Sequence, residues 1–376
     1  MGLEEQLPYY YWLHTVQGIG NKTIRTLRSA FRTPEQIYKA TVMDLKPFLT
    51  EAQLQQLISH KQKWDVKKEY QLLKQKKIHM YPMLHPDYPE RLKKIPDSPQ
   101  ILYALGELPA KDRLSVAIIG ARMCSQYGRY MAREFAIALA NAGIQVISGM
   151  ALGVDGISQR AALQSGTNSY AVLGSGVDIC YPKENEDIYK LMCSQGGIIS
   201  EYPPGTTPIP RNFPPRNRII SGLADVILVI EAKDKSGTSI TVDMALEQGK
   251  EVYALPGRVN DALSRGCNQL IRQGAAIATS PEEFIEELNN TYGRKQKSIS
   301  TKIQSESYQQ QQLLFLSPIE ETILHIMDIT PMPIHQIHSL VCEKKSISIP
   351  ELMDTLMTLC LKQIIIQQGS YYMLKK

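Results

Sequence analysis

Two short loops in the middle of the chain carry residue types suited to binding phosphate. Gly120 and Arg122 follow the apolar run Ser115–Ile119, where a glycine lets a ligand approach the backbone and an arginine can donate paired hydrogen bonds to an anion. Ser236, Gly237 and Thr238 precede a helical segment, and small residues at a helix start can hold a phosphate or simply cap the helix. A plain turn with a surface arginine is the alternative for the first loop.

The most unusual stretch, Phe213–Arg218, reads Phe-Pro-Pro-Arg-Asn-Arg. The two prolines predict an extended approach to the apolar helix that follows. At the N-terminus of that helix, Arg216, Asn217 and Arg218 could bind successive phosphates, and Phe213 could stack on a base. An internal ion pair fits Arg218 equally well, and a core position fits Phe213 equally well. For Arg216 we favour phosphate binding.

The placement of histidine and cysteine argues against several classes of enzyme. None of the seven histidines lies between residues 86 and 324, so a Ser-His-Asp triad or a zinc helix would have to be assembled across domains. The six cysteines are scattered without a Cys-x-x-Cys pair, which predicts reduced thiols and no zinc site. A P-loop motif is absent, and Gly174-Ser175-Gly176 lacks the last glycine of the dinucleotide fingerprint. We therefore expect no metal and no cofactor.

Composition predicts a cytoplasmic protein with more than one domain. The chain has 376 residues, 43% of them hydrophobic, and no apolar run of eighteen residues that could form a transmembrane helix. Glu4 and Glu5 occupy the place where a secretory signal would carry cations. The net charge of +5 is too mild to indicate nucleic-acid binding by itself, although residues 1–110 alone carry an excess of five positive charges.

Apolar strands alternate with helical segments between residues 111 and 285. Strands that are apolar throughout are typical of a parallel sheet covered by helices on both faces. The sequence thus predicts a doubly wound, mostly parallel α/β domain that binds ligands outside the carboxyl ends of its strands. The predicted strands are Ser115–Ile119, Ile144–Ser148, Ser169–Leu173, Gly197–Ser200, Asp225–Glu231 and Glu251–Leu255.

The residues before this region predict a helical domain over residues 1–80, with helices at 21–31, 44–59 and 64–75. Gly18-Ile19-Gly20 joins two helical patterns, as in a helix-hairpin-helix or SAM-like domain. The amides of such a turn can bind a DNA phosphate, or the turn can serve packing alone.

The residues after the central domain (81–289) divide into a polar linker over 290–312 and a small final domain over 313–376. Three helical patterns and a hairpin in the final domain predict a winged helix. Its acidic residues, among them Glu351 and Asp354, argue against strong DNA binding and favour a partner or regulatory surface.

Taken in order, these motifs resemble the DprA (Smf) family of bacterial DNA-processing proteins. The resemblance covers roughly residues 81–280. The family often has His where this chain has Gln159 and Thr where it has Cys267, and neither position lies in the phosphate loops. The residues that carry the resemblance are Tyr88–Leu92, Ile95–Pro99, Ala117–Arg122, Ser148–Asp155, Tyr181–Lys183, Ser200–Pro203, Phe213–Arg218, Ser236–Thr238 and Pro256-Gly257.

The resemblance implies an extended Rossmann-like domain that forms a homodimer and has no turnover chemistry. It also implies that the protein binds and protects single-stranded DNA during natural transformation and helps to load the RecA recombinase onto it. Carried over residue by residue, it places Arg122, Lys183 and the Phe213–Arg218 loop in the DNA pocket, with Gly120 and Ser236–Thr238 as further candidates.

Two other functions compete with DNA binding. Related Rossmann-like proteins cleave nucleoside monophosphates at the glycosidic bond and carry Pro-Gly-Gly-x-Gly-Thr-x-x-Glu, but aligning Gly237-Thr238 with that motif puts Thr241 in place of the glutamate. Asp234 and Lys235 replace its glycines, so glycosidic chemistry has no evident acid or base. The third possible function is that of a scaffold protein whose DNA groove is vestigial. A gel shift with poly-dT distinguishes such a scaffold from a DNA-binding protein.

Incubation of the protein with AMP is expected to release no adenine, because the acidic position of the hydrolase motif holds Thr241. Chromatography of the reaction mixture measures this directly. Adenine released in proportion to protein concentration would favour the enzyme over the DNA-binding protein.

Overall fold

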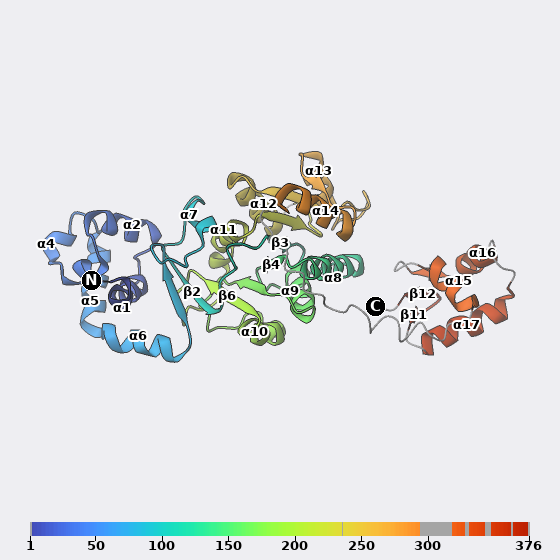
Figure 1. Cartoon of the computed structure of the whole chain (residues 1–376), viewed down its shortest axis with the longest axis horizontal. Coiled ribbons are helices and arrows are strands. Elements are labelled where there is room, and N and C mark those ends of the chain that lie inside the picture. The colour runs from blue at the N-terminus through green and yellow to red at the C-terminus, as the bar shows by residue number, and fades with distance from the viewer. Residues whose placement is uncertain are drawn as a thin grey trace. The chain divides into compact units, whose positions relative to one another are not determined.

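The computed structural model of the chain describes residues 2–234, 236–293, 318–327, 331–342, 347–361 and 364–374. These residues belong to two compact units, which lie within residues 1–297 and 298–376 (Figure 1). Among the described residues, no helix has the length and apolar character needed to cross a membrane.

A nine-stranded sheet with the order β1-β2-β6-β5-β4-β3-β7-β8-β9 is the centre of the first unit. All neighbours from β6 to β9 pair in parallel, whereas β1–β2 and β2–β6 pair antiparallel. Each predicted strand overlaps one of β3 to β8, so the predicted mostly parallel sheet is confirmed. The strands are β1 (His79–Pro82), β2 (Ile101–Gly106), β3 (Ser115–Ile119), β4 (Gln145–Ser148), β5 (Ser169–Val172), β6 (Gly196–Ser200), β7 (Val226–Val229), β8 (Glu251–Ala254) and β9 (Ala276–Ile277).

Helices cover both faces of this sheet, which explains why its central strands are apolar throughout. In β3, Val116 and Ile118 face one core with Phe135 of α8, whereas Ala117 and Ile119 face the other core with α11 and α12. Alternate residues of a strand point to opposite faces, so a doubly covered strand needs apolar residues at every position. The helices are α7 (Glu90–Lys93), α8 (Gln126–Asn141), α9 (Val154–Gln164), α10 (Glu186–Met192), α11 (Phe213–Leu223), α12 (Gly237–Glu247), α13 (Arg265–Arg272) and α14 (Pro281–Tyr292).

The chain reverses its direction of travel across the sheet at β3. From β3 it proceeds outward through β4, β5 and β6, then returns to place β7 on the other side of β3. Such a reversal separates the loops that follow the two neighbouring strands and leaves a crevice at their carboxyl ends, where doubly wound proteins bind ligands. The loops after β3 and β7 are those predicted from sequence to bind phosphate.

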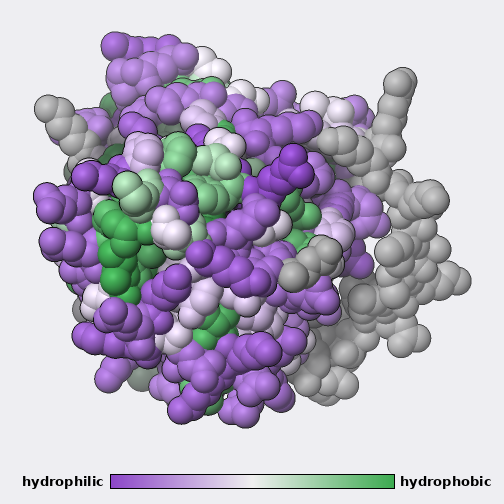
Figure 2. Space-filling view, turned by 90° about the vertical axis from the view of Figure 1, so that its left-hand side faces the viewer, coloured by the Kyte–Doolittle hydropathy of each residue, from purple (hydrophilic) through white to green (hydrophobic). Residues whose placement is uncertain are grey.

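The N-terminal helices pack around their own apolar core and share the first unit with the sheet. The predicted boundary at residue 80 falls inside β1, which pairs with β2. Viewed from this end, the surface is mostly hydrophilic with apolar patches (Figure 2), and Val42, Met43 and Phe48 are exposed apolar residues of this segment. The helices are α1 (Leu3–Thr15), α2 (Asn21–Ala30), α3 (Pro34–Lys39), α4 (Val42–Leu45), α5 (Glu51–Lys63) and α6 (Val66–Gln75).

The predicted helix over residues 44–59 is wrong, because the structure has two helices there. α4 ends at Leu45, and Thr50 begins α5 by accepting a hydrogen bond from the amide of Gln53. Gln53 in turn accepts one from the amide of Thr50, which completes a capping box. The apolar spacing continues across this break and therefore hides it.

The described residues of the second unit form three helices and a three-stranded antiparallel sheet of order β10-β12-β11. The helices and the hairpin agree with the three helical patterns and the hairpin expected for residues 313–376, whereas β10 was not predicted. Most of the predicted linker lies outside the described residues, and residues 290–292 belong to α14. The elements are α15 (Pro318–Ile326), β10 (Met332–Pro333), α16 (Ile334–Cys342), α17 (Ile349–Leu361), β11 (Ile365–Gln368) and β12 (Tyr371–Leu374).

A half-buried histidine joins α1 to the sheet. His14 Nδ1 lies 2.9 Å from the hydroxyl of Tyr103 in β2. Burial lowers the pKa of His14 from 6.5 to about 4, because the interior disfavours the charged imidazolium. His14 is therefore a neutral structural residue at neutral pH.

The first unit is expected to lose about 2 kcal/mol of stability through His14 between pH 7 and pH 5. The unfolded histidine protonates near pH 6.5 whereas the folded one stays neutral to about pH 4, so stability present above 6.5 declines as the pH falls toward 4. Urea unfolding at both pH values, compared with His14→Gln, measures this. Equal pH dependence in the variant and the unsubstituted chain would contradict the assignment.

Candidate nucleic-acid interface

A cavity of about 500 Å³ opens where the chain reverses, at the carboxyl ends of β3 and β7. Its wall comes from the loops after β3, β4 and β7, from the first turns of α11 and from the start of α12. The cavity therefore brings together loops that are far apart in the sequence. The predicted site residues that line it are Gly120, Arg122, Phe213, Arg216, Asn217, Ser236, Gly237 and Thr238.

The predicted extended approach of Phe213–Arg218 is wrong, since this stretch forms the first turns of α11. Pro214 and Pro215 occupy the first turn, where the backbone N–H that proline lacks has no helical partner in any case. Residues 216–218 are thus successive helical residues, and their side chains diverge by about 100° per step. They cannot bind three successive phosphates along one line.

Arg216 forms the floor of the cavity and is only 5% exposed. Its Nη1 donates hydrogen bonds to the carbonyl oxygens of Val172 and Gly149, the latter at 2.9 Å. A Cβ at Gly149 would lie 2.7 Å from Nη2 of Arg216, so the close approach requires glycine there. Burial lowers the pKa of Arg216 to about 10, although the neighbouring Asp155 carboxylate opposes this shift. The guanidinium therefore ties α11 to the ends of β4 and β5.

Asp155 lies in the first turn of α9, and its Oδ2 accepts a hydrogen bond from the amide of Gly149 at 3.1 Å. Burial raises the pKa of Asp155, whereas the charge of Arg216 lowers it. Because Asp155 also lines the cavity, it offsets part of the positive charge of Arg216. Sequence analysis did not connect these two residues.

Among the described residues, two exposed cations line the cavity. Arg122 follows β3 and Lys233 follows β7, and neither forms an ion pair with any residue in the described ranges. Lys233 was missed by sequence reasoning, although a lysine directly after an apolar strand was the available signal. These two side chains give the cavity its accessible positive charge.

The loop that carries Arg122 is held in place by the end of β7. The backbone amide of Ala121 donates to the carbonyl oxygen of Glu231 at 2.8 Å. The buried carboxylate of Glu231 accepts hydrogen bonds from the amide and the hydroxyl of Ser125, which caps α8. The position of the loop that carries Arg122 thus depends on the Glu231 carboxylate, which does not line the cavity.

The start of α12 leaves hydrogen-bonding groups available to an anion. Ser236 stands at the N-cap, yet its buried Oγ has no hydrogen-bond partner among the described residues and does not cap the helix. Gly237 and Thr238 follow it and also line the cavity. The amides in the first turn of a helix have no intrahelical acceptor and favour negative charge.

Phe213 lies between the cavity and an exposed aromatic ring. Its ring centroid is 5.7 Å from that of Tyr181, and Arg216 Cζ lies 5.8 Å from it on the cavity side. Gly174 packs behind Phe213, where a Cβ would come within 2.8 Å of the ring. The exposed Lys183 does not line the cavity and is connected to it only through the segment that carries Tyr181.

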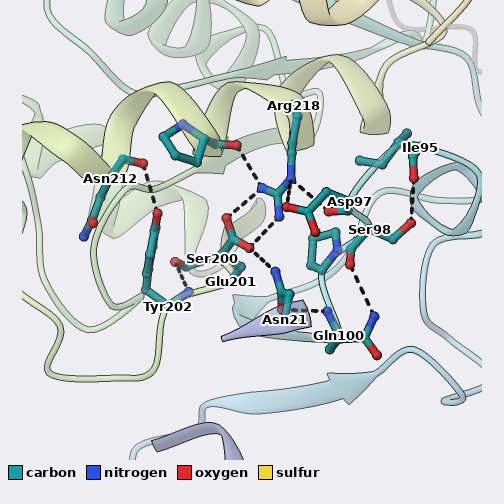
Figure 3. Close-up of polar contacts among 12 residues, drawn as sticks. Asn21, Ile95, Asp97, Ser98, Gln100, Ser200, Glu201, Tyr202, Asn212 and Arg218 are labelled. Carbon is teal, nitrogen blue, oxygen red and sulfur yellow. Dashed lines mark hydrogen bonds and ion pairs between the residues drawn. The ribbon is translucent and has the colours of Figure 1, made fainter. Parts of the chain in front are cut away.

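Arg218 points away from the cavity into a buried polar network (Figure 3). Its two terminal nitrogens each lie 2.7 Å from an oxygen of Glu201, and its Nε donates to the carbonyl of Asp97 at 2.9 Å. Asn21, at the start of α2, donates to Glu201 Oε2 at 3.0 Å. This is the internal ion pair that the sequence left open, and it removes Arg218 from the candidate phosphate contacts.

A mostly parallel sheet covered by helices on both faces, with a cavity at its reversal point, defines a doubly wound, Rossmann-like α/β protein. The family described as DNA recombination-mediator protein A matches residues 79–289. The chain belongs to this family, and the predicted DprA (Smf) resemblance is confirmed.

Several relatives and solved structures agree with this membership. Protein Smf of Escherichia coli is 40% identical over 64% of each chain, and DNA processing protein DprA of Streptococcus pneumoniae is 38% identical over 56% of this chain and 74% of its own length. The S. pneumoniae DprA structure has a TM-score of 0.65 at 32% identity and covers 74% of this chain and 97% of that one. A Helicobacter pylori DprA, solved for its single-stranded DNA binding mode, has a TM-score of 0.52 at 30% identity and covers 57% and 97%.

Glu201→Ala is expected to destabilise the first unit by about 3 kcal/mol, because it removes the bidentate partner of the buried Arg218 guanidinium and leaves it only the longer ion pair with Asp97. Asp187→Ala breaks the more exposed pair with Arg160 and should cost less than about 1 kcal/mol. Urea unfolding compares the two. Equal losses in both variants would show that the Glu201 pair is no more important than a surface one.

Proposed function

We propose that the chain binds single-stranded DNA in the cavity between β3 and β7, protects the strand and helps to load the RecA recombinase onto it, without catalysing a reaction. The observation that carries the proposal is the convergence of Arg122, Lys233 and the start of α12 beside the ring of Phe213. Membership of the recombination-mediator family supports the same function.

The chemistry of the cavity suits a DNA backbone rather than a particular base sequence. Arg122 and Lys233 are exposed and can each neutralise a phosphate, and the amides of Gly237 and Thr238 at the start of α12 can donate hydrogen bonds to another charged oxygen. Phosphates are the same at every nucleotide, so these contacts give affinity without sequence preference. Phe213 offers a ring face to a base, which is available for stacking only when the strand is unpaired.

The carboxylate geometry supports a binding role over glycosidic hydrolysis. Asp155 is the one acidic residue among the described residues that line the cavity, and it is engaged by the Gly149 amide and by the charge of Arg216. Glycosidases generally need two carboxyl groups on opposite sides of the bond, one to donate a proton and one to act as base or nucleophile. We therefore retain the nucleotide hydrolase only as the alternative.

The proposed organisation keeps the predicted domains: a helix-hairpin-helix or SAM-like domain over 1–80, the Rossmann-like domain over 81–289, the linker over 290–312 and a winged helix over 313–376. On α17, Ile349, Met353 and Met357 are exposed at intervals of four residues, which supports a partner-binding rather than a DNA-binding role for the winged helix. The homodimer, the RecA partner and natural transformation rest on the family resemblance, and the cytoplasmic location rests on the composition of the sequence.

Arg122→Ala is expected to weaken binding to oligonucleotides of any sequence by about tenfold, because it removes one phosphate contact. The slope of log affinity against log salt should become shallower by about 0.7. Arg133→Ala, which removes an exposed arginine of α8 outside the cavity lining, is the matched control.

Fluorescence anisotropy with labelled poly-dT at several salt concentrations measures both quantities, and RecA filament nucleation on the same strand is followed in parallel. Unchanged affinity of Arg122→Ala at two salt concentrations would place the DNA elsewhere. Normal DNA binding without any effect on RecA nucleation would overturn the loading role alone.

A further inference from the structure

We propose that Tyr181 is a stacking site for an unpaired nucleobase at the rim of the cavity, so that the bound strand runs from the cavity across Phe213 and Tyr181 toward Lys183. This inference rests on the proposed function and deepens it, because it assigns a base contact and a direction to the strand. It also explains how Lys183, which does not line the cavity, takes part in the same site.

The aromatic surface is continuous from the cavity to the solvent. Phe213 lines the cavity, and the ring of Tyr181 packs against it with a centroid separation of 5.7 Å and an interplanar angle of 34°. The Tyr181 residue is 46% exposed. A base leaving the cavity therefore meets a second ring directly beyond Phe213.

Neighbouring tyrosines show what a structural tyrosine looks like in this region. Tyr189 donates its hydroxyl hydrogen bond to the carbonyl of Val177 at 2.6 Å, and Tyr202 donates to that of Asn212 at 3.2 Å. Burial raises the pKa of Tyr202 to about 12. The hydroxyl of Tyr181, in contrast, makes no hydrogen bond with any residue the structure describes. Its exposed ring is therefore available to a ligand.

The segment that presents Tyr181 is fixed to the wall of the cavity. Asn185, four residues later, donates from Nδ2 to the carbonyl oxygens of Met150 and Ala151 at 3.0 and 3.1 Å. Ala151 itself lines the cavity. The rings of Phe213 and Tyr181 thus form an aromatic platform that is held in place before any strand binds. Such a fixed platform loses little conformational entropy on binding.

Lys183 gives the platform a cationic end. It is exposed, follows Tyr181 by two residues and forms no ion pair with a described residue. A nucleotide whose base stacks on Tyr181 would have its phosphate free to contact Lys183. Stacking on an aromatic side chain strengthens binding by about tenfold per base, and paired bases in a duplex do not offer their faces. The platform therefore favours single strands.

The test compares poly-dT with an abasic oligonucleotide of the same length, which keeps the phosphates and lacks the bases. Tyr181→Ala is expected to weaken poly-dT binding by about tenfold and to leave both abasic binding and the salt slope unchanged. Tyr181→Phe keeps the ring and should bind normally. Tyr371→Ala, which removes an equally exposed tyrosine from β12, is the matched control.

Photocrosslinking with a strand that contains 5-iododeoxyuridine provides a second measurement on the unsubstituted protein. We expect the crosslink to map to the peptide that carries Tyr181. Tyr181→Ala with unchanged poly-dT affinity, or with equal losses for poly-dT and the abasic strand, would overturn the stacking site. Failure of the unsubstituted chain to bind poly-dT at all would overturn the proposed function itself, and this inference with it.

Discussion

The structure of the site depends on the burial of one positive charge. Arg216 is placed below the cavity, where its guanidinium is bonded to the carbonyl oxygens of Gly149 and Val172 and lies beside Asp155. A buried charge without partners would be strongly destabilising, so the ends of β4 and β5, the start of α9 and helix α11 must keep their positions around it. The same constraint explains why position 149 has no side chain.

The accessible charge of the cavity is small and local. Asp155 offsets Arg216, which leaves Arg122, Lys233 and the start of α12 as the groups that an anion meets first. This agrees with a chain whose net charge is only +5, because a few converging cations need no strongly basic composition. Ser236, whose buried Oγ has no hydrogen-bond partner in the part of the chain that the structure describes, lies at the same end of the cavity.

Sequence was sufficient to predict the sheet and the loops at its carboxyl ends, because fully buried strands and glycine-rich strand ends leave strong local patterns. It did not predict which contacts Arg216 and Arg218 make. Both are arginines of one short motif, and only their angular positions around the helix differ. The proline pair suggested an extended segment, although proline is equally at home in the first turn of a helix. Lys233, Asp155 and Tyr181 acquire their roles from neighbours distant in sequence, which no local pattern records.

The two sides of helix α11 make different contacts. Arg216 faces the cavity, whereas Arg218 faces Glu201, which in turn holds Asn21 at the start of the N-terminal helix α2. A rigid helix moves as one body, so any displacement of α11 by an occupant of the cavity must be accommodated at the Asn21 contact as well. The Arg218–Glu201 pair and the Asn21 hydrogen bond thus form a continuous polar connection between α11 and the N-terminal helices.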